Sequence, residues 1–165
     1  YIKEKRKEIK IIIVEDITHM FHRRIQSPDF RALKSGGAAF AKWGDFAADV
    51  YSSLFDESLF NQDVTLIHMY HNTDVDTPDG VKSDILTQGK LLDEKIKPAS
   101  YFTYVLYTKV LSSSEEEEVE KRYVFVTNND DYRRAKTPHT CFKSLYITND
   151  LKLVIDTIHK FKKGE

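Results

Sequence analysis

The sequence predicts an α/β fold with a mainly parallel sheet, and three segments near its start carry this prediction. The run Ile11–Val14 is apolar and β-branched, which is typical of a strand buried on both faces. Residues 63–71 form a second run that reads as a buried strand. Between them, apolar side chains recur at spacings of three and four over residues 38–60, which predicts a long helix or a pair of helices. A strand, a helical crossover and another strand predict a parallel pair.

Two acids, Glu15 and Asp16, follow the first strand directly. The carboxyl end of such a strand is where open α/β sheets place their ligands. Either Asp16 or Thr18 is suited to cap a following helix, because both side chains can accept a backbone N–H bond. The Ser-Pro-Asp segment at residues 27–29 is expected to break this helix, and Pro28 suits the first turn of the next one.

The middle of the chain predicts a long loop and then an antiparallel pair of strands. Residues 72–89 are polar and rich in turn formers, with one turn predicted at residues 77–80, Thr-Pro-Asp-Gly. A loop of this length in a compact domain is often functional. Further strands are predicted at residues 101–111 and 123–127, and the acidic segment 112–120 is expected to form the hairpin tip that joins them.

A terminal helix is predicted over residues 151–161. Asn149 and Asp150 precede it and are suited to cap it. Lysines at positions 160, 162 and 163 stand near its carboxyl end, where positive charge complements the helix dipole.

Length and composition indicate one domain, residues 1–165, in a reducing compartment. The chain is long enough for a hydrophobic core, and its net charge of −1 gives no overall attraction to nucleic acid or to an anionic membrane. The single cysteine, Cys141, excludes an internal disulfide and is expected in the core. The longest apolar stretch is far shorter than the ~20 residues of a membrane span. We therefore expect a cytoplasmic protein with no membrane partner.

The order of these segments resembles a known family. Four stretches carry the resemblance most specifically: GKLLDEKI at residues 89–96, YFT at 101–103, AKTP at 135–138 and NDLKLV at 149–154. With the acid-ended strand, the helical crossover and the antiparallel hairpin, they resemble the carboxyl-terminal part of phage- and prophage-encoded P-loop ATPases of the AAA and RecA-like type. The resemblance runs from Ile9 to Phe161. It implies a RecA-like core that binds ATP and Mg²⁺ and supports DNA recombination or replication in a bacterial host cell.

The resemblance also implies catalytic roles at the ends of the two apolar strands. Glu15 and Asp16 match the Walker B acid pair, in which one acid holds Mg²⁺ and the other polarises the attacking water. The family more usually has Asp where this chain has Glu15, so the division of these two roles stays open. His71 matches the polar residue that ends the next strand and senses the γ-phosphate.

Basic residues are assigned to subunit and DNA contacts in the same way. Lys136 matches the lysine of the family's K-[ST]-P stretch, which in ring-forming ATPases can reach a neighbouring subunit's nucleotide, and Arg133 and Arg134 compete for this role. A homo-oligomeric ring or filament is implied. Lys82 and Lys90 lie in the long loop, where family loops can touch the phosphates of single-stranded DNA.

One motif of the family is missing from these residues. No G-x-x-x-x-G-K-[ST] phosphate loop occurs in the 165 residues, and residues 139–142 read His-Thr-Cys-Phe where the family often has Gly-Met-Phe. Without the phosphate loop there is no backbone cradle for the β- and γ-phosphates. We therefore expect the chain to be part of a longer ATPase and to bind ATP poorly by itself. The alternative is a non-catalytic interaction or DNA-binding module that retains the fold.

A metal-dependent hydrolase is a weaker alternative, based on a run of histidines and acids: His68, His71, Asp74, Asp76 and Asp79. These residue types bind zinc, manganese or iron. However, His68 and His71 are three apart on a predicted strand and point to opposite faces, so they cannot share a metal unless the strand ends between them. His19 and His22 are three apart on a predicted helix, and we expect a surface pair there because nothing near them in the sequence completes a site.

Overall fold

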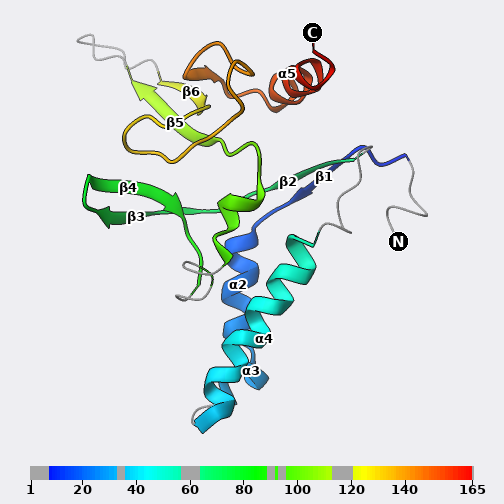
Figure 1. Ribbon diagram of the computed structural model, residues 1–165, viewed down its shortest axis with the longest axis vertical. Coiled ribbons are helices and arrows are strands. Elements are labelled where there is room, and N and C mark those ends of the chain that lie inside the picture. The colour runs from blue at the N-terminus through cyan, green and yellow to red at the C-terminus, as the bar shows by residue number, and fades with distance from the viewer. Residues whose placement is uncertain are drawn as a thin grey trace. The chain divides into compact units, whose positions relative to one another are not determined.

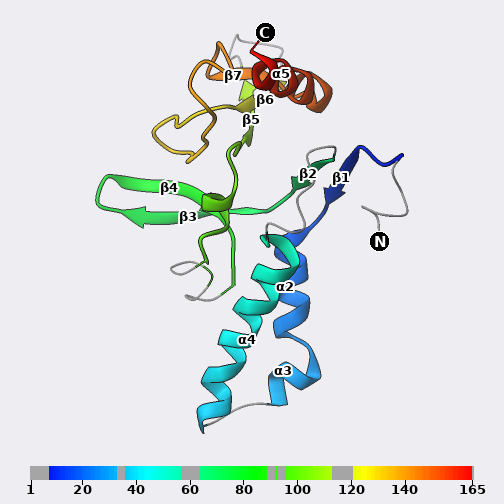
Figure 2. The ribbon, with the colours of Figure 1, turned by 45° about the vertical axis from the view of Figure 1, so that its right-hand side comes forward.

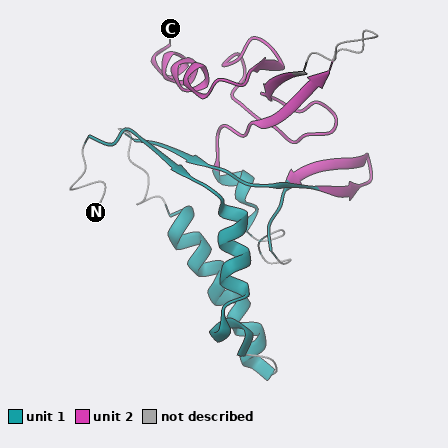
Figure 3. Ribbon diagram, turned by 180° about the vertical axis from the view of Figure 1, so that it is seen from behind, with its two compact units in different colours: residues 1–73, 85–101 teal, residues 74–84, 102–165 magenta. Residues whose placement is uncertain are grey.

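The computed structural model describes residues 8–32, 36–56, 64–88, 92, 96–112 and 121–164. They belong to two compact units (Figure 3). Unit 1 comprises residues 1–73 and 85–101, and unit 2 comprises residues 74–84 and 102–165. The candidate acids and histidines of the sequence analysis fall mostly in unit 1, and the basic residues fall mostly in unit 2.

Unit 1 is built on a parallel pair of strands, β1 (Ile11–Val14) and β2 (Thr65–His68). Ile11 lies opposite Thr65 and Val14 lies opposite His68, so the two strands end at the same level. The predicted parallel pairing is therefore confirmed. The connection contains the helices α2 (Ile17–Ile25), α3 (Pro28–Ala32) and α4 (Gly36–Leu54), as Figure 1 shows.

Local sequence explains where these helices begin. The Asp16 side chain accepts backbone hydrogen bonds at the start of α2, and Pro28 is the first residue of α3. Helix α4 returns alongside α2 (Figure 2), and the Phe21 and Phe46 rings meet edge to face, with centroids 6.0 Å apart. Phe30 packs against Phe46 in the same way. Each of these buried rings contributes about 1.5–3 kcal/mol of burial free energy.

The prediction that Ile11–Val14 is buried on both faces is wrong. Ile11 is 46% exposed and Ile13 is 49% exposed, so alternate side chains on one face of β1 meet solvent. Among the described residues this sheet has two strands. One face of β1 therefore lacks the cover that a strand receives inside a larger α/β sheet.

The predicted long loop at residues 72–89 is, over most of its length, a β-hairpin. Strands β3 (Asn72–Thr77) and β4 (Gly80–Ile85) pair side by side, and their arrows run in opposite directions in Figure 1. The predicted turn lies between them, where the Thr77 hydroxyl donates to the Gly80 carbonyl over 2.6 Å. Gly80 has φ of 100°, which other residues rarely adopt. The polar residues indicate a loop because β3 is mostly exposed and the most buried residue of β4, Ser83, is itself polar.

Unit 2 also contains an antiparallel sheet of three strands: β5 (Tyr107–Ser112), β6 (Lys121–Val126) and β7 (Tyr146–Thr148). The predicted pairing of the first two is confirmed, with Tyr107 opposite Val126. The first of them was predicted to begin at residue 101, but Pro98–Tyr101 is a 3-10 helix and β5 begins only at Tyr107. β7 was not predicted, because three residues are too few for a periodic pattern. Residues 113–120, where the hairpin tip was expected, lie outside the described residues.

The terminal helix α5 (Leu151–Lys163) is capped as predicted. The Asp150 side chain accepts the Leu153 N–H over 3.1 Å, and Gly164 closes the helix in the left-handed conformation. Buried apolar residues of this unit include Val124, Val126 and Val154. Cys141 is also buried, as predicted, and burial raises the pKa of its thiol.

The chain is thus of mixed α/β class, as predicted. Within the described residues, however, parallel pairing is confined to β1 and β2, and the other sheets are a hairpin and an antiparallel meander. The expectation of a mainly parallel sheet is not met there, because β3 joins β4 and β5 joins β6 through connections too short for a parallel crossover, which permit only antiparallel pairing.

Candidate functional site

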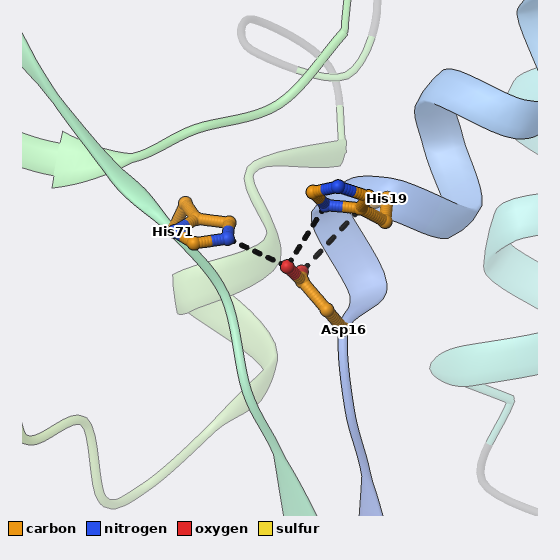
Figure 4. A group of neighbouring side chains, drawn as sticks. All are labelled: Asp16, His19 and His71. Carbon is orange, nitrogen blue, oxygen red and sulfur yellow. Dashed lines mark hydrogen bonds and ion pairs between the residues drawn. The ribbon is translucent and has the colours of Figure 1, made fainter.

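Three polar side chains converge at the carboxyl ends of β1 and β2 (Figure 4). Asp16 follows β1, His71 follows β2, and His19 stands in the first turn of α2. The Asp16 Oδ2 atom lies 2.6 Å from His71 Nε2 and 3.0 Å from His19 Nδ1. One ligand atom from each residue lies within 4.8 Å of the other two. This edge of the sheet is the position that the sequence predicted for ligands.

The two oxygens of Asp16 have different tasks. Oδ1 accepts the backbone N–H of Thr18 over 2.9 Å and that of His19 over 3.4 Å, and it therefore caps α2. Oδ2 faces both imidazoles. Because the cap holds Oδ1, the direction of Oδ2 is fixed by the start of the helix.

A buried hydroxyl holds His71 in place. Thr18 is 1% exposed, and its Oγ1 accepts the His71 N–H over 3.0 Å while donating to the Leu86 carbonyl over 3.3 Å. The Leu86 N–H in turn donates to the His71 carbonyl over 2.8 Å. The backbone on both sides of the His71 side chain is therefore tied to the core of unit 1.

Backbone hydrogen bonds also join the strand ends to the helix. The Met69 N–H donates to the Val14 carbonyl over 3.0 Å, and the Ile17 N–H donates to the Met69 carbonyl over 3.1 Å. The residues on either side of Glu15 and Asp16 are thus both attached to the segment that carries His71. The Glu15–Asp16 peptide bond is cis.

The surroundings favour the ionised form of Asp16. Partial burial opposes ionisation and raises the pKa of the carboxyl. The hydrogen bond from the His19 N–H and the charge of the nearby His71 imidazole outweigh it, so the pKa lies below its ordinary value of 3.8. The cluster remains open to solvent, because the side chains of Asp16, His19 and His71 are 23%, 74% and 61% exposed. It can present one carboxylate and two imidazoles to a ligand.

Glu15 is placed differently from Asp16. Its side chain is exposed and has no hydrogen-bond or ion-pair partner among the described residues. A carboxylate in this position is free to bind a cation or a water molecule from solvent.

The predicted basic residues of unit 2 are largely engaged. Arg133 Nη1 lies 3.1 Å from Asp130 Oδ2, and Arg134 Nη1 lies 2.7 Å from Asp84 Oδ2. Because each guanidinium already has a carboxylate partner, neither is a ready contact for a nucleotide phosphate.

The three lysines assigned to subunit or DNA contacts differ in their surroundings. Lys82 donates to the Asp131 carbonyl. Lys136 pairs with Val105 through its backbone, and its exposed ammonium has no ion-pair partner in the described part of the chain. Lys90 lies outside the described residues. Of the residues assigned to subunit or DNA contacts, Lys136 is the one whose described surroundings leave its charge available.

The histidine and acid run of the hydrolase alternative is not brought together as a metal-ligating group within the described residues. Burial lowers the pKa of His68 to about 4, so its imidazole is neutral near pH 7. The Asp74 carboxylate accepts a hydrogen bond from the Tyr132 hydroxyl within unit 2. The residues that do converge are Asp16, His19 and His71.

His19 is the site residue that sequence reasoning missed. The histidine pair at positions 19 and 22 suggested a surface feature, although His19 stands three residues after the predicted cap Asp16. A residue at that spacing meets the cap side chain across the first helical turn. Because the two strands pair in parallel, the segment after the second strand, which carries His71, is then expected beside Asp16 and His19.

Comparison with protein-family models, with curated proteins and with solved structures found no match for this chain. Among the described residues, none of the helices combines the length and the apolar character that a membrane span requires.

Proposed function

We propose that this chain is the carboxyl-terminal part of a RecA-like P-loop ATPase that acts in DNA recombination or replication. One observation carries the proposal. Asp16 and His71 meet at the carboxyl ends of two adjacent parallel strands, with 2.6 Å between Oδ2 and Nε2. An acid and a polar residue in this relation are what the resemblance to the family implies for its nucleotide site.

The residues at this edge fit a magnesium–nucleotide complex. Mg²⁺ keeps several of its waters and is usually bound through one or two carboxylates together with substrate phosphates. Glu15 is exposed and Asp16 is partly exposed, so both carboxylates are accessible to such a complex. When bound, the ion neutralises charge that develops on the phosphates.

Each residue then has a distinct task. Asp16 is kept ionised by its surroundings. Its carboxylate accepts a hydrogen bond from the attacking water and so orients that water. His71 donates from its imidazole to a phosphate oxygen, while the Thr18 hydroxyl holds its backbone in place. Lys136 offers its charge to the nucleotide of a neighbouring subunit in an oligomer. The phosphate loop is supplied by residues outside this sequence.

ATP turnover by the protein that includes the phosphate loop tests this proposal. Asp16→Asn and Glu15→Gln remove the charge of each acid with little change in size, and at least one should lower turnover by about 100-fold or more. Asp45→Asn, on the exposed surface of α4, is the matched control and should leave turnover unchanged. Unchanged turnover in both acid variants would refute the assignment. If the longer protein neither binds nor hydrolyses ATP, a non-catalytic module takes the place of the ATPase.

A further inference from the structure

We propose that Asp16, His19 and His71 form a binding site for a divalent transition metal ion such as Zn²⁺ or Co²⁺. The ligand atoms are Asp16 Oδ2, His19 Nδ1 and His71 Nε2. The site includes two residues of the proposed nucleotide site but needs neither ATP nor a phosphate loop. Metal binding by this site can therefore be confirmed or refuted independently of the ATPase proposal.

The spacing of the ligand atoms suits such an ion. With metal–ligand bonds of about 2.1 Å, neighbouring ligands are about 3.4 Å apart in a tetrahedral site and about 3.0 Å apart in an octahedral one. The two carboxylate-to-imidazole distances are 2.6 and 3.0 Å, and all three atoms lie within 4.8 Å of one another. To bind one ion together, Asp16 Oδ2 and His71 Nε2 would have to move apart from their hydrogen-bonded distance of 2.6 Å.

The chemistry of the ligand atoms selects the class of ion. Imidazole suits Zn²⁺, Co²⁺, Ni²⁺ and Fe²⁺, whereas Mg²⁺ and Ca²⁺ prefer oxygen ligands. Two imidazoles and one carboxylate thus favour a transition metal over magnesium. Three protein ligands leave at least one position for water or a substrate oxygen, which is the pattern of catalytic rather than structural zinc sites.

The backbone positions the ligands before any ion binds. Asp16 and His19 are held by the first turn of α2, and the Thr18 hydroxyl and the Leu86 backbone hold His71. Such preorganisation lowers the conformational entropy that is lost on binding. The imidazoles themselves are mostly exposed, so an ion can reach them from solvent.

Titration of the 165-residue chain with Co²⁺, without nucleotide, tests the site. Co²⁺ bound by imidazole gives visible absorption bands, and saturation is expected at one ion per chain. Zn²⁺ should displace it, and millimolar Mg²⁺ should not. Absence of saturable binding, or displacement by Mg²⁺, would show that the two imidazoles only make hydrogen bonds to the helix cap.

Three variants locate the ion, and each is chosen to leave the fold intact. His19→Ala places a better helix former in α2, His71→Ala keeps the backbone bonds to Thr18 and Leu86, and Asp16→Asn keeps a capping side chain. Each should weaken Co²⁺ binding by about tenfold or more. His139→Ala, which removes an exposed histidine of unit 2, should bind as the unaltered chain does. The proposal fails if His19→Ala and His71→Ala bind Co²⁺ as tightly as His139→Ala, with circular dichroism confirming that all are folded.

Discussion

Asp16 in unit 1 and Asp130 in unit 2 have the same local geometry. In each, Oδ1 accepts the backbone N–H groups of the residues two and three positions later, at 2.9 and 3.4 Å for Asp16 and at 3.3 and 2.6 Å for Asp130. In each, Oδ2 meets the side chain three positions later, which is His19 at 3.0 Å or Arg133 at 3.1 Å. A third side chain from elsewhere in the unit approaches the same oxygen.

The two carboxylates differ in the chemistry of these partners. Asp16 is surrounded by imidazoles, and neutral imidazole has a lone pair that can bind a metal ion. Asp130 lies near the Arg133 guanidinium and, at 3.7 Å, the Lys109 ammonium, neither of which offers a lone pair. The Asp130 side chain is 3% exposed against 23% for Asp16. The same backbone motif therefore places Asp16 in a solvent-accessible cluster that can bind a ligand, and places Asp130 in a buried network of ion pairs.

The largest effect is expected at Asp130. Asp130→Asn removes the buried anion and leaves Arg133 and Lys109 uncompensated, which should lower the stability of unit 2 by about 3 kcal/mol. Hydrogen exchange of the β5 and β6 amides in urea measures this loss. Asp131→Asn is the matched control, because Asp131 has φ of 68° and Asn tolerates that conformation. Equal losses in the two variants would show that the ion pairs do not stabilise unit 2.

Low pH should destabilise unit 2, because it protonates the Asp130 carboxylate. Burial raises the pKa of Asp130, but hydrogen bonds from the Arg133 backbone and side chain outweigh it and hold the pKa below its ordinary value of 3.8. A lowered folded-state pKa stabilises the fold above the unfolded pKa, and this stability is lost as the pH falls through the folded pKa. The protection of the β5 and β6 amides, meaning their exchange rate relative to the intrinsic rate at the same pH, should therefore fall below about pH 4. Asp130→Asn should flatten this dependence, and an unchanged acid slope would contradict the assignment.

A smaller loss is expected when the support of His71 is removed. Thr18→Val keeps the shape of the side chain but leaves the His71 N–H and the Leu86 carbonyl without their partner, which should cost unit 1 about 1–2 kcal/mol. The fluorescence of Trp43, the single tryptophan, reports the unfolding of unit 1. Ser53→Ala, exposed on α4, should change the unfolding midpoint little. If Thr18→Val and Ser53→Ala have the same unfolding midpoint, the hydrogen bonds of the Thr18 hydroxyl do not stabilise the segment that carries His71.

The smallest change in stability is expected at Asp16. Asn caps helices about as well as Asp, so Asp16→Asn should alter the unfolding free energy of unit 1 by about 0.5 kcal/mol or less. Asp16→Ala removes the cap and should cost about 1 kcal/mol. Urea unfolding followed by Trp43 fluorescence compares the two. A loss in Asp16→Asn as large as that in Asp130→Asn would mean that both carboxylates are structural, and the contrast between the units would disappear.

Local features of this fold were predictable because each depends on residues a few positions apart. The caps at Asp16 and Asp150 follow from side chains that accept N–H bonds from the next turn of their own backbone, although the sequence offered Thr18 as well as Asp16 for the first cap. The helix start at Pro28 follows from the fixed φ and missing N–H of proline. The turn at residues 77–80 follows from Gly80, because glycine is the residue type that adopts a φ of 100° without strain. The strands on either side of this turn were missed because their mostly polar residues show no apolar alternation.

The sequence predicts that an acid pair ends a strand, that Asp16 or Thr18 caps a following helix, and that His71 ends a second strand. Tertiary structure alone decided that these features form one site. The parallel register of β1 and β2, and a Thr18 hydroxyl bonded to a residue 53 positions away, bring His71 beside Asp16 and His19. It also decided that Arg133 and Arg134 are paired with carboxylates. Such contacts depend on which distant segments pack together, and no spacing within one segment encodes that choice.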